Sequence, residues 1–184
     1  MKTVLKGLGV VGLILYPFIV GYGLSQGYMF GVAVFLMIMG GLRWVTGGGT
    51  LMWPLTFFAI LCGGLSLVFK DQAWLKLYPV MMSLWACVIF TITLFKPPSM
   101  IERFARLVEP ELPQDGVIWT KKVTQIWCVF FVVNALIALY TVYFASTQVW
   151  VIYNGFISYV LMGILLLGEY RLRKRQQGLN QMRR

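Results

Sequence analysis

The sequence predicts an all-α integral membrane protein: a polytopic bundle of about six transmembrane helices that forms one domain over residues 1–184. Three observations lead to this fold class. Hydrophobic residues make up 59% of the chain and charged residues only 12%, whereas an average soluble domain has about 25% charged residues. A soluble fold of this size would leave much apolar surface in water, while a bilayer is itself an apolar solvent. The charged residues also stand at the edges of long neutral runs.

Two spans are predicted before Arg43. A charge at the centre of a spanning helix costs about 2.5–3.5 kcal/mol, and such a helix needs about 20 apolar residues, so long neutral runs mark the spans. Residues 7–42 form one of these runs. The run accommodates two short passes, residues 7–24 and 28–42, if the chain turns at the polar Ser25-Gln26-Gly27. Pro17 predicts a kink in the first pass.

Four further spans follow from the later neutral runs. The glycine run Gly47–Gly49 indicates a loop, which leaves residues 51–69 for the third span. Lys76 and Lys96 bound the fourth span at residues 77–95. The long neutral stretch after Lys122 divides at a polar turn near Ser146-Thr147-Gln148. The last two spans are residues 123–144 and 149–168, and residues 169–184 form a basic cytoplasmic tail.

The basic residues predict the orientation. With six passes and both termini in the cytoplasm, Lys70 and Lys76 are the only two of the 16 Lys and Arg residues outside. Cytoplasmic segments carry an excess of Lys and Arg, so we expect a multi-pass protein of the bacterial inner membrane with cytoplasmic N- and C-termini. One alternative is that Lys2, Lys6 and the segment up to Gly23-Leu24-Ser25 form a cleavable signal peptide. Cleavage there would leave the orientation of the other spans unchanged.

Residues 96–122 form a cytoplasmic connector between the fourth and fifth spans and contain a short amphipathic helix. Pro97-Pro98 stops the fourth span, and Ser99 with Glu102 forms a capping box. Glu102 and Arg106 are spaced for an i,i+4 ion pair. The helix either lies in the membrane interface as a connector or docks a cytoplasmic partner or an anionic headgroup. Its apolar face carries Met100, Ile101, Phe104, Leu107 and Val108, and its charged face carries Glu102, Arg103, Arg106 and Glu109.

The sequence offers no group suited to catalysis or metal binding. It contains no His, and Cys62, Cys87 and Cys128 lie far apart in apolar stretches, which predicts core residues and no metal or cofactor site. No ionisable residue lies well inside a predicted span, which argues against proton-coupled transport and intramembrane hydrolysis. We therefore predict that the protein is not an enzyme. Because the basic residues lie at span edges, we also predict no nucleic-acid partner.

Neutral amides and the basic tail are the remaining candidates for contact with a ligand or partner. Asn134 lies near the middle of the fifth span and Asn154 in the sixth, where an unpaired amide is costly. Each amide either bonds a neighbouring helix or contacts a ligand. The tail either holds anionic lipid or acts only as an inside-retention signal. The candidate contact residues are Met100, Arg103, Phe104, Arg106, Asn134, Asn154, Arg171, Arg173, Lys174 and Arg175.

From Gly63 onward, the order of several short motifs resembles the intracellular septation protein A family of small inner-membrane proteins. The motifs are Gly63–Phe69 before an acid-containing turn, Lys96-Pro97, Glu111-Leu112-Pro113, Trp119, Trp127–Phe131 and Trp150-Val151. Asn154 stands where the family usually has Lys, and Ala138 lies where it tends to place an amide, so the chain resembles a divergent branch. The resemblance implies an inner-membrane protein of envelope maintenance or division, with no catalytic residues to carry over.

Two functions follow from these features. The first is a non-enzymatic inner-membrane protein that supports cell-envelope biogenesis or septation through contacts with other envelope or division proteins. The alternative is a carrier or accessory protein for a lipid or an acylated intermediate of the aryl-polyene type, a class that the resemblance implies. Its cleft would be lined by Gly and neutral polar residues. The lipid bilayer is a partner in both, and the alternative adds a lipid-like ligand.

Overall fold

The computed structural model describes residues 18–45 and 53–182, and this part of the chain consists of helices and turns without a strand. The predicted all-α class is therefore confirmed. Residues 18–25 form the first described helix. The elements that follow are α2 (Met29–Val45), α3 (Trp53–Phe69), α4 (Ala73–Lys76), α5 (Tyr78–Phe95), α6 (Met100–Val108), α7 (Gln114–Phe144), α8 (Thr147–Ile152), the π-helical turn η2 (Tyr153–Ile157) and α9 (Ser158–Met182).

Three of the described helical segments are long and apolar enough to cross a membrane. They are Ala73–Phe95, Gln114–Phe144 and Thr147–Arg171, and they contain the predicted spans 77–95, 123–144 and 149–168. The apolar helix Phe57–Phe69 is shorter and lies in the predicted span 51–69. The count of six spans stays a prediction.

The predicted spans at the N-terminal end are only partly covered by the described residues. Helix α2 has 17 residues and begins one residue after the start of the predicted span 28–42. Most of the predicted span 7–24 lies outside the described residues. Ser25 and Gln26 end the first described helix as expected, and Gly27 takes a positive φ of 76° in the turn, a conformation that glycine adopts without steric cost.

Helix α7 begins far earlier than the fifth span was predicted to begin. Pro113 takes the N-cap position with extended backbone, and Asp115 stands in the first turn, where a negative charge complements the helix dipole. No proline interrupts the chain between Gln114 and residue 123, so the helix continues from the interface into the apolar stretch. The C-terminal part of the predicted connector is thus helical.

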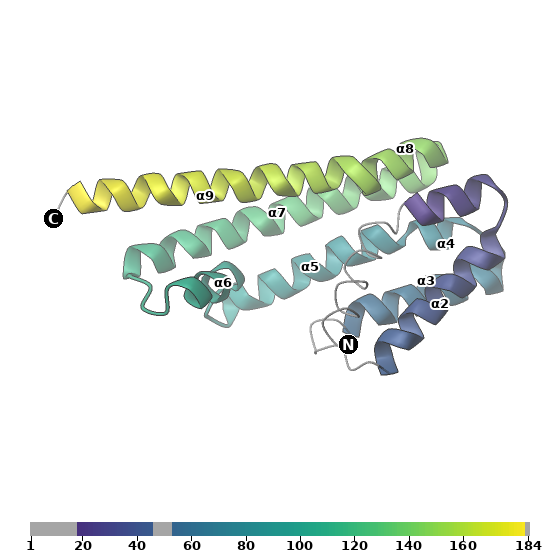
Figure 1. Cartoon of the computed structure of the whole chain (residues 1–184), viewed down its shortest axis with the longest axis horizontal. Coiled ribbons are helices and arrows are strands. Elements are labelled where there is room, and N and C mark those ends of the chain that lie inside the picture. The colour runs from purple at the N-terminus through teal and green to yellow at the C-terminus, as the bar shows by residue number, and fades with distance from the viewer. Residues whose placement is uncertain (1–17, 46–52, 183–184) are drawn as a thin grey trace.

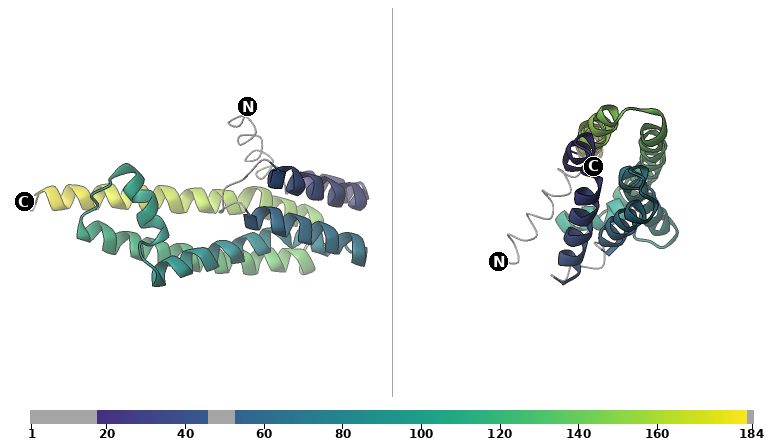
Figure 2. Two further views of the ribbon diagram at one scale, coloured as in Figure 1. Left: turned by 90° about the horizontal axis from the view of Figure 1, so that it is seen from below. Right: turned by 90° about the vertical axis from the view of Figure 1, so that its right-hand side faces the viewer.

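The long helices α5, α7 and α9 run side by side along the long axis of the molecule (Figure 1). Helix α4, helix α8 and the turn before α2 lie together at one end, and α6 lies at the other end with the C-terminal part of α9. The two further views show that α2 and α3 flank only the half of the bundle nearest α4 (Figure 2). We call these the α4 end and the α6 end.

Close packing between the shorter helices depends on glycine. A Cβ atom on Gly63 of α3 would lie 3.2 Å from the backbone oxygen of Ala33 in α2, so a larger side chain would push these helices apart. A Cβ atom on Gly21 would overlap the side chain of Val151 in α8. Small residues permit this close approach of helices in membranes.

The buried apolar side chains form two clusters, one towards each end. The larger cluster surrounds Trp150 and Leu75, both fully buried, and includes Ala135 and Ala138 of α7. The smaller cluster contains Ile101, Val123, Trp127 and Phe131. Elsewhere the long helices expose large apolar side chains, including Val129, Leu136, Tyr140, Ile164 and Leu167. Such an apolar exterior is suited to lipid and unsuited to water.

Cysteine labelling tests the placement of the two ends. In a protein whose three cysteines are replaced by alanine, Asp71→Cys and Gln148→Cys are expected to react alike with a membrane-impermeant maleimide, because both positions are exposed at the α4 end. Glu111→Cys, exposed near α6, should show the opposite accessibility in intact and inverted membranes. If Glu111→Cys and Gln148→Cys label from the same side, the arrangement across the membrane is wrong.

Candidate functional site

The amide of Asn134 in α7 connects three helices inside the bundle. Its side chain is 4% exposed. The Nδ2 group donates to Ser83 Oγ of α5 over 2.9 Å, and Tyr153 Oη of η2 donates to Asn134 Oδ1 over 3.0 Å. Hydrogen bonds between membrane helices contribute about 0.6 kcal/mol on average and up to about 1.7 kcal/mol. The amide therefore serves the packing of α5, α7 and η2, while contact with a ligand stays a prediction.

Asn154 occupies the π-helical turn and also bonds within the protein. Its Nδ2 group donates to Thr141 Oγ1 over 3.2 Å and to the carbonyl oxygen of Trp150 over 2.9 Å. Ser158 Oγ donates to the backbone oxygen of Asn154 over 3.3 Å. A π-helical turn shifts the regular backbone pairing of a helix, and these side chains bond the carbonyl groups around it. Contact of Asn154 with a partner or ligand likewise stays a prediction.

The environment of Lys76 was not predicted from the sequence. It marks the edge of a predicted span, yet in the structure it is only 5% exposed. Its Nζ donates to Thr147 Oγ1 over 2.9 Å, and its backbone oxygen accepts from Trp150 Nε1 over 3.1 Å. The apolar neighbours Leu75 and Leu77 are the only local sign of this burial. A charge can mark a span edge and still be covered by the helices beside it.

Hydroxyl groups from two neighbouring helices hold the N-terminus of α6. The first N–H groups of a helix have no partner within it. Here the Met100 N–H donates to Thr93 Oγ1 of α5 over 2.9 Å, and the Ile101 N–H donates to Thr124 Oγ1 of α7 over 3.3 Å. Each hydroxyl in turn donates to a carbonyl of its own helix, at 2.7 Å and 2.8 Å, which leaves its oxygen free to accept. Both threonines are buried.

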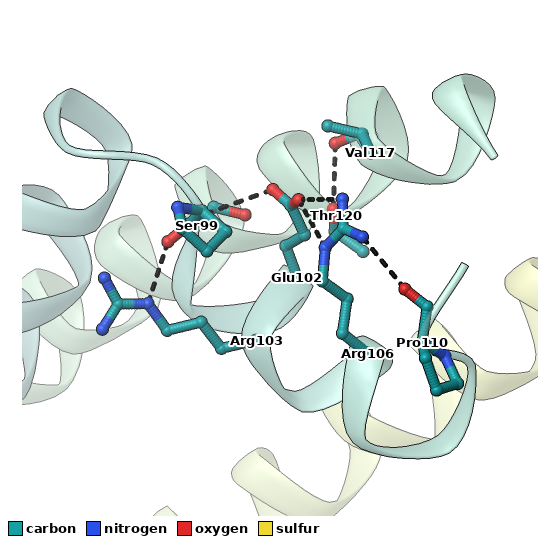
Figure 3. A network of polar contacts seen from close by, with 8 residues as sticks. Ser99, Glu102, Arg103, Arg106, Pro110, Val117 and Thr120 are labelled. Atoms are coloured by element: carbon teal, nitrogen blue, oxygen red, sulfur yellow. Dashed lines mark hydrogen bonds and ion pairs between the residues drawn. The ribbon is translucent and has the colours of Figure 1, made fainter. Parts of the chain in front are cut away.

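The predicted ion pair of α6 is confirmed and forms the centre of a polar network (Figure 3). Glu102 Oε1 lies 2.8 Å from Arg106 Nη2 and also accepts from Arg106 Nε over 2.9 Å. The second oxygen of Glu102 accepts the Ser99 N–H over 3.3 Å, which is the carboxylate half of the predicted capping box. Arg106 Nη1 donates onward to the Pro110 carbonyl over 3.1 Å, and Arg103 Nε to the Pro98 carbonyl over 3.0 Å.

The predicted assignment of the faces of α6 is corrected in two places. Glu102 was expected on the charged, solvent-facing side, but it is 6% exposed, because its carboxylate turns back to Ser99 and neutralises Arg106. The predicted apolar face is also divided. Met100 and Ile101 are buried, whereas the exposed fraction is 51% for Phe104, 81% for Leu107 and 84% for Val108. We call Phe104, Leu107 and Val108 the α6 edge.

The remaining candidate residues lie in α9. Arg171 is exposed, beyond the apolar part of the helix. The side chains of Arg173, Lys174 and Arg175 lie outside the described residues, so their predicted contact with lipid or a partner stays a prediction. Within residues 18–45 and 53–182, no group of three or more His, Cys, Asp or Glu residues is placed to hold a metal ion.

This arrangement defines a small helical membrane protein in which polar side chains inside the described bundle bond helices to one another. The chain belongs to the intracellular septation protein A family, whose model matches residues 1–177. No solved structure matches it significantly.

Curated relatives of the chain are named inner membrane-spanning protein YciB. The relative from Coxiella burnetii is 27% identical over 113 residues, which cover 61% of this chain and 60% of the relative. The relative from Nitrosomonas eutropha is 27% identical over 127 residues, which cover 65% and 68%. The relative from Methylobacillus flagellatus is 26% identical over 112 residues, which cover 60% of each. The match thus spans about 60% of the length of the first and third of these relatives.

Removal of the central amide tests the network around Asn134. Asn134→Leu is expected to lower the free energy of unfolding by about 1–2 kcal/mol, because it leaves the Ser83 and Tyr153 hydroxyl groups without this partner. Val133→Ala, on the exposed side of the same helix, is the control and should cost less. Unfolding in mixed micelles measures both. Adding Tyr153→Phe to Asn134→Leu should cost little more, and full additivity would show that the two groups are not coupled.

A second prediction concerns the buried carboxylate of α6. Arg106→Met leaves Glu102 buried without its cation, so we expect α6 to lose about 2 kcal/mol of local stability. Arg103→Met is the matched control, because Arg103 is exposed and its Nε donates to a backbone carbonyl, that of Pro98. Amide hydrogen exchange over residues 100–108 measures the effect. Equal exchange in the two variants would contradict the role given to the ion pair.

Proposed function

We propose that this protein supports cell-envelope biogenesis or septation by binding other inner-membrane proteins, without catalysing a reaction. The observation that carries the proposal is the α6 edge: a helix held at its N-terminus by α5 and α7 presents Phe104, Leu107 and Val108 outward. The partner we propose for this edge is an apolar segment of another membrane protein at the same depth.

The fixed orientation of α6 supports binding of a protein partner in preference to simple anchoring of the chain in the membrane interface. A helix that only anchors a chain in the interface needs an apolar face and no fixed orientation. Here the hydroxyl groups of Thr93 in α5 and Thr124 in α7 accept from the first N–H groups of α6 and hold the helix in one orientation against the bundle. Ordering that is complete before binding lowers the entropic cost of association. Large apolar side chains on a fixed helix are therefore suited to contact a protein partner.

The chemistry of the described bundle supports binding in place of catalysis. The buried polar side chains Ser83, Asn134, Tyr153 and Asn154 bond one another or a neighbouring helix. A catalytic acid or base needs a titratable group aimed at a substrate. The one buried carboxylate, Glu102, is neutralised by Arg106. Each of these groups thus has a structural role already.

The charge distribution supports cytoplasmic N- and C-termini. Exposed Lys96, Arg103, Lys121, Lys122 and Arg171 lie in or beside α6 or towards the α6 end of α7 and α9. Lys70 and Lys76 lie by α4. Cytoplasmic segments of membrane proteins carry an excess of positive charge, and this supports a cytoplasmic position of α6 as part of the proposal.

Replacement of the α6 edge tests the proposed function. The variant Phe104→Ala, Leu107→Ala, Val108→Ala is expected to reach normal membrane levels and a near-normal melting temperature, because these side chains are exposed. It should nevertheless fail to restore envelope integrity and division in a deletion strain. The matched control is Val133→Ala, Leu136→Ala, Tyr140→Ala, which removes comparable exposed side chains from α7 and should restore both. Full restoration by the α6 variant would disprove the proposal.

A further inference from the structure

The ammonium group of Lys76 is a buried cation without a paired carboxylate in the described chain. The chain has six acidic residues, and Asp71 is the one that lies beside α4. Asp71 is exposed, its Oδ1 accepts the Ala73 N–H over 2.8 Å, and its charge acts on Lys76 through space without an ion-pair contact. The carboxylate of Glu102 pairs with Arg106 at the α6 end, far from Lys76. Lys76 Nζ instead donates to the neutral hydroxyl of Thr147.

A buried charge of this kind calls for an explanation, because removal of an ammonium group from water is unfavourable unless an anion compensates it. A lysine carries three N–H donors, and the Thr147 hydroxyl takes one of them. The remaining donors suit an anion that comes from outside the chain.

The link between α4 and α8 does not explain the side chain of Lys76. That link is made by the Trp150 indole, which donates to the backbone oxygen of residue 76 over 3.1 Å. Any residue at position 76 offers the same carbonyl group. The positive charge of the side chain therefore has a reason separate from the packing of Trp150.

The turn before α4 carries residues that are typical of the lipid headgroup region. Phe69 and Trp74, on either side of the turn between α3 and α4, stack with ring centroids 5.6 Å apart. Aromatic residues are enriched at the boundary between hydrocarbon and headgroups. Lys70, exposed in the same turn, adds a second positive charge. The α4 end thus combines an aromatic pair, two cations and one exposed acid that accepts a backbone N–H.

We propose that Lys76 binds the phosphate of an anionic lipid headgroup at the α4 end of the bundle. The phosphate oxygens accept from Lys76 Nζ beside Thr147, and Lys70 adds attraction at longer range. The site is separate from the α6 edge and does not depend on the function proposed for that edge. The lipid is recognised through charge and hydrogen bonding, and no bond is made or broken.

Purified full-length protein in nanodiscs tests the proposal. Discs of phosphatidylcholine are compared with discs that also contain phosphatidylglycerol, and melting temperature is measured alongside lipid retention by native mass spectrometry. Phosphatidylglycerol should raise the melting temperature of the wild type. Lys76→Met should lose this increase and retain phosphatidylglycerol about tenfold less well, as expected for one charge-assisted bond. Lys76→Arg and the exposed-lysine control Lys70→Met should keep most of both effects.

The other outcomes separate the alternatives. An equal increase in Lys76→Met and wild type overturns the proposal, and so does an equal destabilisation of Lys76→Met in both kinds of disc, which would assign Lys76 to packing alone. If inorganic phosphate added to phosphatidylcholine discs reproduces the increase, the ligand is a soluble anion and the headgroup assignment is overturned.

A second variant decides the matter if Lys76→Met does not fold. Thr147→Val removes the competing acceptor and keeps the ammonium group. The proposal then expects a larger effect of phosphatidylglycerol on the melting temperature than in the wild type. An unchanged effect overturns it.

Discussion

The two hydrogen bonds of the Asn134 amide fix the relative positions of three helices, and much of the bundle follows from them. Lipid hydrocarbon offers no hydrogen-bond partner, so a buried amide is stabilised by partners on the same protein. Ser83 and Tyr153 supply these partners from α5 and η2. The position of η2 determines that of α8, the short helix directly before it. Trp150 of α8 donates its indole N–H to the backbone carbonyl of Lys76. A side chain in the middle of α7 is thus linked to the packing of the α4 end.

The same constraint explains why α6 has one orientation. Its first N–H groups emerge where water access is limited by α5 and α7, and buried threonines accept from them. That rotation turns Glu102 inward, and the pairing with Arg106 makes its burial tolerable. Because the N-terminus of α6 is held in this orientation, Phe104, Leu107 and Val108 point away from the bundle. The exposed edge is a consequence of satisfied polar groups, and not of apolar periodicity alone.

The parts of the fold that depend on local chemistry could be predicted, and those that depend on tertiary contacts could not. Apolar runs between charges predicted the ends of α5 and α7 at Phe95 and Phe144, because charge and polar turns stop a span. Helix α7 begins at Gln114, before the predicted start of the fifth span at residue 123, because a helix also continues through the polar interface. The inward rotation of Glu102 and the burial of Lys76 depend on hydroxyl and indole groups from distant helices. No window of sequence around either residue contains those partners.

The two ends of the molecule differ in where their positive charges lie: they are exposed at the α6 end, whereas Lys76 is buried at the α4 end. At the α6 end, Arg103, Lys121 and Lys122 are exposed, and the buried Glu102 is neutralised within the protein. Charge there is exposed to water, and the apolar α6 edge is exposed beside it. At the α4 end, the protein buries a cation and supplies only a hydroxyl oxygen to it. A fold that elsewhere satisfies its central amides internally leaves this charge for a partner outside the chain, and in a headgroup layer the abundant anion is a lipid phosphate.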